Sequence, residues 1–207
     1  MVQPNPRVQV WDLGVKADAP LHHWMLAIGE VGEKVEEVAY TDGSKAPDGL
    51  VRAGFVIREG SWHRTLLRHS TVYEGEVVAV VVAVKKNRAS KMLVLTDCQS
   101  VVKAVDGAIG DSLPTGGAVG EIWSTTGDKE VALGWVKAQV GVPGNEAADV
   151  AAKRGAGMDE GTRVMPEVDR RTVAQSLAAR RRSRYRHTWG GEAPLGGAGR
   201  HARRTPG

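Results

Sequence analysis

The order of the strand-like and helix-like runs constrains this chain more than any other feature of its sequence. Three runs rich in β-branched and aromatic residues come first, at residues 35–41, 51–58 and 62–68, and a Glu-Gly-Ser turn joins the last two as a hairpin. Strand-like runs at 92–96 and 131–136 then alternate with helical ones. A meander followed by alternating strands and helices predicts an α/β fold, with a mixed sheet covered by helices.

One apolar run does not reveal its structure by periodicity. Residues 77–84 fit a single helical stripe, but their mostly β-branched composition suits a buried strand equally well. The runs at 100–109, 119–125 and 145–156 are predicted helices, and glycine and proline punctuate both ends of the last one. Together these elements define a predicted domain at residues 33–158.

Residues 1–32 are interpreted as an N-terminal extension. Residues 1–19 are polar, with two prolines, and are expected to be irregular. Leu21, Trp24, Met25 and Ile28 then follow the spacing of a short amphipathic helix, whose expected role is packing.

Residues 159–207 form a basic tail. From residue 161 onward the chain has 11 arginines, no lysine and three acids, whereas residues 1–160 have a net charge of −4. A helix is possible over 170–187, and the composition of 190–207 is typical of disorder. This charge run either contacts phosphates or is merely solvated.

Cysteine content and hydropathy exclude two classes of protein. Cys98 is the only cysteine, so no internal disulfide can form, and no leader-like segment opens the chain. The longest apolar run has eight residues, whereas a membrane span needs about 20. We therefore expect an intracellular protein of the nucleus or cytoplasm that is neither secreted nor membrane-bound.

Four acidic residues lie in or beside apolar sequence, where an unpaired charge is costly: Asp42, at the end of the first predicted strand, Glu76, in the first turn of a helix, Asp97, which ends the fourth strand, and Asp149, in the last helix. Neighbouring first and fourth strands would bring Asp42 and Asp97 together at one edge of the sheet. Converging carboxylates suit hard divalent cations, and two such ions can clamp a phosphate and activate water.

Each of these acids also has an ordinary structural explanation. An Asp before Gly is often a turn residue, Asp97 is a natural helix N-cap, and Asp149 lies near a helix start, where a negative charge favours the dipole. The residues taken singly leave both interpretations open.

The strings that contain the four acids resemble the ribonuclease H family, in the form carried by non-LTR retrotransposon polyproteins. The resemblance rests on four motifs in matching order and spacing: Tyr40-Thr-Asp-Gly-Ser44, Gly75-Glu-Val-Val-Ala79, Leu95-Thr-Asp-Cys-Gln99 and Gly141-Val-Pro-Gly-Asn-Glu-Ala-Ala-Asp149. It covers about residues 35–157 and implies an RNase H-like fold with a mixed five-stranded sheet, three antiparallel strands followed by two parallel ones.

The resemblance implies a metal-binding catalytic tetrad that hydrolyses the RNA strand of RNA–DNA hybrids. Its members would be Asp42, Glu76, Asp97 and Asp149, which would hold two Mg²⁺ or Mn²⁺ ions. Water would be the nucleophile, and the products would carry a 5′-phosphate and a 3′-hydroxyl. Glu74 is a rival to Glu76, but only Glu76 is in register with the motif. Substrate contacts are expected from Gly43, Ser44, Thr71, Gln99 and Asn145, with little sequence preference.

The chain departs from the family pattern in the loop before the last helix. Gln139 stands where the family usually has a histidine, and no histidine occurs between His69 and His187. An amide cannot carry a proton, so we expect slowed turnover with metal binding retained. Cys98 replaces the usual serine and is expected to be unreactive.

Two functions from different classes follow from this. The first is an active, retroelement-derived hybrid endonuclease, which a reverse transcriptase would assist in cis or in trans. The alternative is a catalytically weakened or inactive RNase H-like domain that binds nucleic acid. The sequence gives no prediction of oligomeric state.

Overall fold

The computed structural model describes residues 7–66, 68–110 and 117–154, and within them a single mixed sheet organises the fold. Its six strands lie in the order β1-β6-β5-β2-β3-β4. The elements along the chain are β1 (Val8–Trp11), α1 (Leu21–Gly32), β2 (Glu37–Lys45), β3 (Val51–Ile57), β4 (Gly60–Thr65), α2 (Val72–Lys86), β5 (Lys91–Thr96), α3 (Gln99–Gly110), α4 (Ala118–Thr126), β6 (Glu130–Trp135) and α5 (Pro143–Arg154).

The strand pairing confirms the predicted α/β fold with a mixed sheet. β2, β3 and β4 form the antiparallel meander, and β5 joins β2 in parallel with Tyr40 opposite Leu95. β6 extends the parallel part beside β5, where Thr96 pairs with Trp135. The carboxyl ends of β2, β5 and β6 therefore approach the same region of the molecule, as the sequence order predicts.

The strand count is a correction, because the sheet has a sixth strand where irregular chain was expected. Residues 8–11 form β1, which pairs in parallel with β6 and places Val8 opposite Val131. Alternating apolar residues within only four positions, close to two prolines, gave a weak local signal. The pairing partner lies more than 100 residues away in sequence, so only the tertiary structure reveals this strand.

Two local expectations near the acidic residues also change. β2 continues through Lys45, which pairs with Val51, so Asp42 lies inside a strand and not at its end or in a turn. The undecided run at 77–84 is helical and belongs to α2. Because α2 begins at Val72, Glu76 lies in its second turn and not its first.

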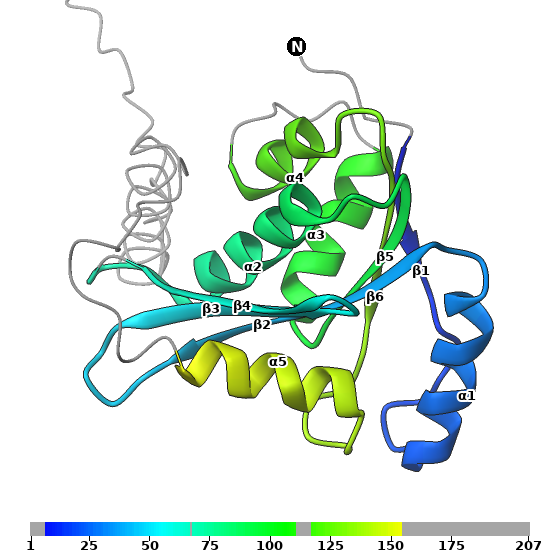
Figure 1. Cartoon of the computed structure of the whole chain (residues 1–207), viewed down its shortest axis with the longest axis horizontal. Coiled ribbons are helices and arrows are strands. Elements are labelled where there is room, and N and C mark those ends of the chain that lie inside the picture. The colour runs from blue at the N-terminus through cyan, green and yellow to red at the C-terminus, as the bar shows by residue number, and fades with distance from the viewer. Residues whose placement is uncertain (1–6, 67, 111–116, 155–207) are drawn as a thin grey trace, which may run out of the picture. The chain divides into compact units, whose positions relative to one another are not determined.

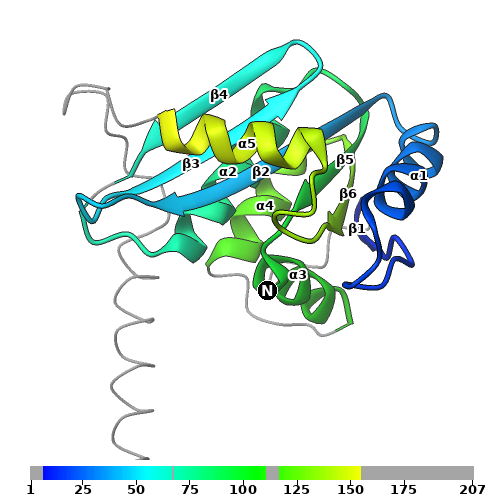
Figure 2. The same ribbon diagram turned by 90° about the horizontal axis from the view of Figure 1, so that it is seen from below.

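Helices cover both faces of the sheet (Figure 1). α2, α3 and α4 lie on one face, where Val80, Met92 and Leu133 are among the fully buried side chains of the larger core. α5 and α1 lie on the opposite face, which Figure 2 shows from below. The predicted packing role of the first helix is confirmed for Trp24 and Ile28, which are buried, whereas Leu21 and Met25 are exposed.

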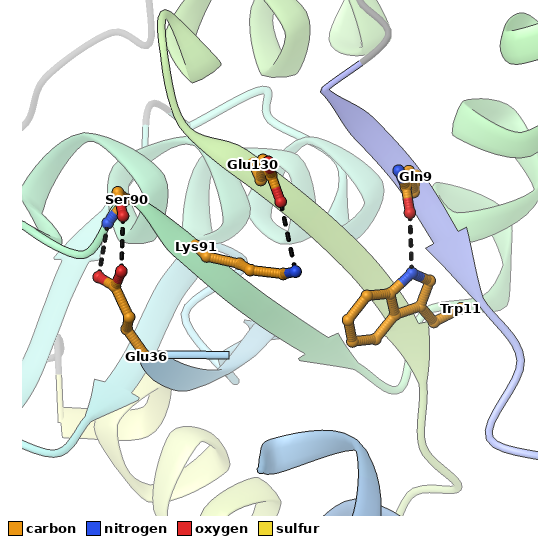
Figure 3. A network of polar contacts seen from close by, with 6 residues as sticks. All are labelled: Gln9, Trp11, Glu36, Ser90, Lys91 and Glu130. Carbon is orange, nitrogen blue, oxygen red and sulfur yellow. Dashed lines mark hydrogen bonds and ion pairs between the residues drawn. The ribbon is translucent and has the colours of Figure 1, made fainter. Parts of the chain in front are cut away.

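Polar contacts lie near the amino ends of β5 and β6 (Figure 3). Glu36 accepts hydrogen bonds from the backbone and hydroxyl of Ser90, and Lys91 forms an ion pair with Glu130. In β1 the indole of Trp11 donates a hydrogen bond to Gln9. The contacts of Glu36 and Lys91 satisfy charged groups at the end of the sheet that lies away from Asp97. Trp11 lies nearer the other end, in register with Gly134.

The basic tail, including the predicted helix at 170–187, lies outside the described residues, and the proposed boundaries at residues 33 and 158 stay predictions. None of the helices in the described part of the chain has both the length and the apolar character that a membrane crossing requires.

Candidate active site

Three of the four predicted acids meet at the centre of the fold. Asp42 comes from β2, Glu76 from α2, and Asp97 from the residue directly after β5. One carboxylate oxygen from each lies within 4.8 Å of the other two. The arrangement therefore joins, from three separate elements, the carboxylates that the sequence placed up to 55 residues apart.

Gly43 makes this convergence sterically possible. A Cβ atom at this position would lie 2.5 Å from the backbone nitrogen of Glu76, closer than real Cβ contacts allow. The absence of a side chain at Gly43 lets α2 approach β2 closely enough to bring Glu76 to Asp42. The predicted contact of Gly43 with substrate stays a prediction, but its packing role is visible in the structure.

Burial and mutual repulsion make the three carboxylates difficult to ionise. Burial, followed by the charges of Asp97 and Asp149, raises the pKa of Asp42 to about 7. Burial, followed by the charges of Asp42 and Asp97, raises the pKa of Glu76 to about 9. The pKa of Asp97 is also raised, mainly by burial. Three acids in this state need either protons or cations beside them.

The hydrogen bonds of the site leave acceptor oxygens free for such a cation. Glu76 accepts a hydrogen bond from the hydroxyl of Thr96, at 3.2 Å, and the backbone of Gly43 hydrogen-bonds to both Glu76 and Asp42. The Oδ2 atom of Asp42 is buried and has no hydrogen-bond partner among the residues that the structure describes. A buried, unpaired carboxylate oxygen is costly unless something else compensates it. The site therefore fits a hard divalent cation with oxygen ligands.

Asp149 lies at the margin of this cluster. Its charge raises the pKa of both Asp42 and Asp97, so it is close to them, but it does not belong to the group of three converging oxygens. It is about one-third exposed and its Oδ2 atom lies 2.5 Å from Nζ of Lys153, one turn further along α5. Among the described residues, Asp149 is thus the member of the four that forms an ion pair with a basic side chain.

The two glutamates of α2 make different contacts. Glu74 forms a capping box with Thr71, in which each side chain bonds to the backbone of the other residue. Glu76 is buried in the acidic cluster. Thr71, predicted to contact substrate, already serves as the N-cap of α2 through the same hydroxyl.

The other predicted substrate residues differ in accessibility. Gln99 is exposed and Ser44 is half-buried, so both can be reached from solvent. Asn145 is 3% exposed and its side chain hydrogen-bonds to Asp97, which lowers the pKa of that acid against the effect of burial. The Oδ1 atom of Asn145 has no partner within the described chain. Its visible contact is with a member of the acidic cluster, and a substrate contact for Asn145 stays a prediction.

Gln139 lies in the exposed loop between β6 and α5. It has φ of +56°, and in the described part of the chain no other non-glycine residue has a positive φ. Side chains rarely adopt this conformation, although Asn, Asp and His do so more readily than others. The backbone at this position therefore suits the histidine that the family usually has there.

Three contacts of the site were not predicted from the sequence: Lys153 with Asp149, Asn145 with Asp97, and the indole of Trp135 with the backbone of Asp97. The first could have been found, because four residues separate an acid and a base on one helix face. The other two connect separate elements, and only the folded structure brings them together.

The comparisons with known proteins agree with this geometry. The family model described as RNase H matches residues 34–157, which contain the four acids and every predicted substrate residue. No curated protein matches the chain.

Proposed function

This chain belongs to the ribonuclease H family, and on that premise we propose that it is an endonuclease that hydrolyses the RNA strand of RNA–DNA hybrids. The observation that carries the proposal is the convergence of Asp42, Glu76 and Asp97, with their raised pKa values and an unpaired buried oxygen. Such a cluster costs folding free energy in the absence of a cation, which indicates that the chain keeps it for binding one.

Asp42, Glu76 and Asp97 would hold a divalent cation directly, and Asp149 would complete a site for two Mg²⁺ ions, with Mn²⁺ as a substitute. Bound ions of this kind supply Lewis-acid activation of water and neutralise charge on the scissile phosphate. The elements that carry the four carboxylates would set the ligand positions: β2 for Asp42, α2 for Glu76, the residue directly after β5 for Asp97, and α5 for Asp149. Asn145 restrains Asp97.

Hybrid recognition would come from residues around this cluster. Gln99 and Ser44 are accessible beside Asp97 and Asp42, and they are the strongest candidates for contacts with the sugar-phosphate backbone. Such contacts read the shape of a hybrid and its 2′-hydroxyl groups, so we expect little sequence preference.

The test is Mg²⁺-dependent cleavage of a hybrid labelled on its RNA strand. Wild-type protein is expected to cleave it and to leave 5′-phosphate ends, and Asp42→Asn is expected to abolish cleavage. Glu36→Gln is the matched control, because it neutralises an exposed acid at the other end of the sheet. Wild-type binding of the hybrid with no cleavage in Mg²⁺ or Mn²⁺ would contradict the proposal.

One observation favours a second candidate, a nucleic-acid-binding domain with weakened catalysis. Gln139 provides no group that titrates near neutral pH in the loop beside the cluster. The same cleavage assay separates the two candidates, since this one predicts tight hybrid binding with little turnover.

The cellular setting belongs to the same proposal. Non-LTR retrotransposon proteins carry the motifs that this chain resembles, which supports a retroelement origin and a reverse transcriptase acting in cis or in trans. We place the activity inside the cell, in the nucleus or cytoplasm, where hybrids form. The arginine-rich tail would add affinity through phosphate contacts, so deleting residues 161–207 is expected to flatten the salt dependence of hybrid binding. An unaltered slope would exclude a contribution of the tail to hybrid binding.

A further inference from the structure

The backbone of Asp97 is held by a side chain that no step of the proposed chemistry uses. β5 ends at Thr96, whose carbonyl accepts a hydrogen bond of 3.0 Å from the backbone of Val136. One residue further, the carbonyl of Asp97 accepts a hydrogen bond of 2.9 Å from the indole nitrogen of Trp135. The side chain of Trp135 thus continues, past the end of the strand, the support that the backbone of β6 gives to β5.

Trp135 is in turn fixed by the helix that precedes the matched domain. Its ring makes an edge-to-face contact with Trp24 of α1, at a centroid distance of 5.6 Å and an interplanar angle of 79°. Trp24 is fully buried, and its indole nitrogen has no hydrogen-bond partner among the described residues, so it acts through packing. Trp24 lies outside residues 34–157, the region that matches the family model.

The position of α1 in the sheet topology explains how this contact arises. α1 connects β1, at one edge of the sheet, to β2, with β6 and β5 between those two strands. A connection of this kind must cross the face of the strands that it skips. α1 therefore lies over this part of the sheet (Figure 2). Its Trp24 belongs to the same hydrophobic cluster as Val136, and Trp135 packs against that cluster.

We propose that Trp135 is a positioning residue for the metal ligand Asp97, and that α1 holds Trp135 in place through Trp24. The proposal rests on the proposed function, because it assigns a role toward the cation that Asp97 would bind. Outer contacts of this kind orient ligands, and their loss typically lowers metal affinity by about 10-fold or more. The consequence is that the N-terminal segment, outside the matched domain, contributes to the metal site.

The first experiment measures Mg²⁺ and Mn²⁺ binding by calorimetry for the full chain and for Trp135→Phe, which removes the indole donor and keeps an aromatic ring. Metal affinity is expected to fall about tenfold in the variant. Trp11→Phe is the matched control, because it removes an indole hydrogen bond to Gln9 in β1 (Figure 3) and is expected to leave metal affinity unchanged.

The second experiment gives a signature that a merely structural role would not produce. In a ¹⁵N-labelled sample, the indole resonance that disappears in Trp135→Phe is expected to shift when Mg²⁺ is added to the wild type. The indole resonance assigned by Trp11→Phe is expected to stay in place. Trp24→Leu is expected to weaken metal binding while the Trp135 indole signal broadens or moves even without metal.

The outcomes separate this inference from the proposed function. Wild-type protein that binds neither ion would overturn both. Wild-type binding with an unchanged affinity in Trp135→Phe, or an indole resonance that ignores Mg²⁺, would overturn the inference and leave the nuclease assignment intact. If Trp24→Leu fails to fold, Trp135→Phe and the wild-type spectrum still decide the question.

Discussion

The acids that lie near the two ends of β5 are in opposite states. At the amino end, Glu36 is exposed and its pKa is lowered, mainly because the side chain of Ser90 donates a hydrogen bond to it. At the carboxyl end, Asp42 and Glu76 are buried with raised pKa values and few donors. Donors from Ser90 satisfy Glu36, whereas the Oδ2 atom of Asp42 has no partner among the described residues. The acids near the carboxyl end are thus the ones that could hold a cation.

The largest expected effect is on catalysis. Glu76→Gln removes a ligand charge and is expected to lower hybrid cleavage by about 10³-fold, as when a charge-stabilising group is lost from an active site. Glu130→Gln, which breaks the exposed ion pair with Lys91, is expected to leave the rate within about twofold, since such pairs contribute little. Steady-state cleavage assays provide the measurement. Equal losses of rate in the two variants would contradict the expected difference between the acids near the two ends of β5.

The next effect concerns stability in the absence of metal. The folded-state pKa values of Asp42 and Glu76 are about 7 and about 9, above their ordinary values of 3.8 and 4.5. Between the ordinary and the folded-state pKa of each group, the folded state therefore binds more protons than the unfolded state. The stabilisation that these two groups contribute is therefore present at low pH and is lost as pH rises from about 4 to 9. In EDTA, Tm is expected to be about 5 °C lower at pH 9 than at pH 5 owing to these groups.

Saturating Mg²⁺ should reverse this loss, because it binds the ionised carboxylates. Asp42→Asn should flatten the pH dependence in EDTA, and Glu36→Gln should not. Scanning calorimetry across the pH range provides the measurement. A Tm in EDTA that falls between pH 5 and 9 as steeply in Asp42→Asn as in the wild type would show that the cluster is not the cause.

Substitution of Asp149 is expected to have a smaller effect on cleavage than substitution of the three converging acids. Because it is partly exposed, paired with Lys153 and outside the three converging oxygens, Asp149→Asn is expected to lower cleavage by about tenfold, less than Glu76→Gln does. The metal-activation curve of each variant gives the comparison. A loss for Asp149→Asn as large as that for Glu76→Gln would place Asp149 among the central ligands.

The smallest expected effect is a gain. Gln139→His introduces a titratable group in this loop. The backbone at this position is left-handed, a conformation that histidine adopts more readily than most residues. Turnover is expected to rise about fivefold, which is modest for a proton carrier. Multiple-turnover rates across pH 6 to 9 check this, with Gln139→Asn as a control that suits the backbone and cannot titrate. An unchanged or lower rate in the histidine variant would remove this role.

Much of the fold and most of the site could be predicted from the sequence because their signals are local or carried by family motifs. The meander of β2 to β4 and the helices α3 to α5 have clear periodicity and punctuation. The acids at 42, 76 and 97 lie in motif strings that identify them without coordinates, and the structure brings all three together.

The remaining features depend on contacts between distant segments. β1 exists because β6 offers it a free edge, and the run at 77–84 becomes a helix because the sheet, α3 and α4 bury it on nearly every side. Neither cause is encoded in a short window, since β-branched residues suit a buried helix or a buried strand when the surroundings provide enough apolar contact.

The sequence by itself determined which acids this chain brings to its site, because residue type and motif spacing carry that information. Only the tertiary structure decided their chemical states. The pKa of a carboxylate depends on burial, neighbouring charges and available donors, and packing sets all three. The same holds for Trp135 and Trp24, whose contacts with Asp97 and with each other arise from the way α1 crosses the sheet.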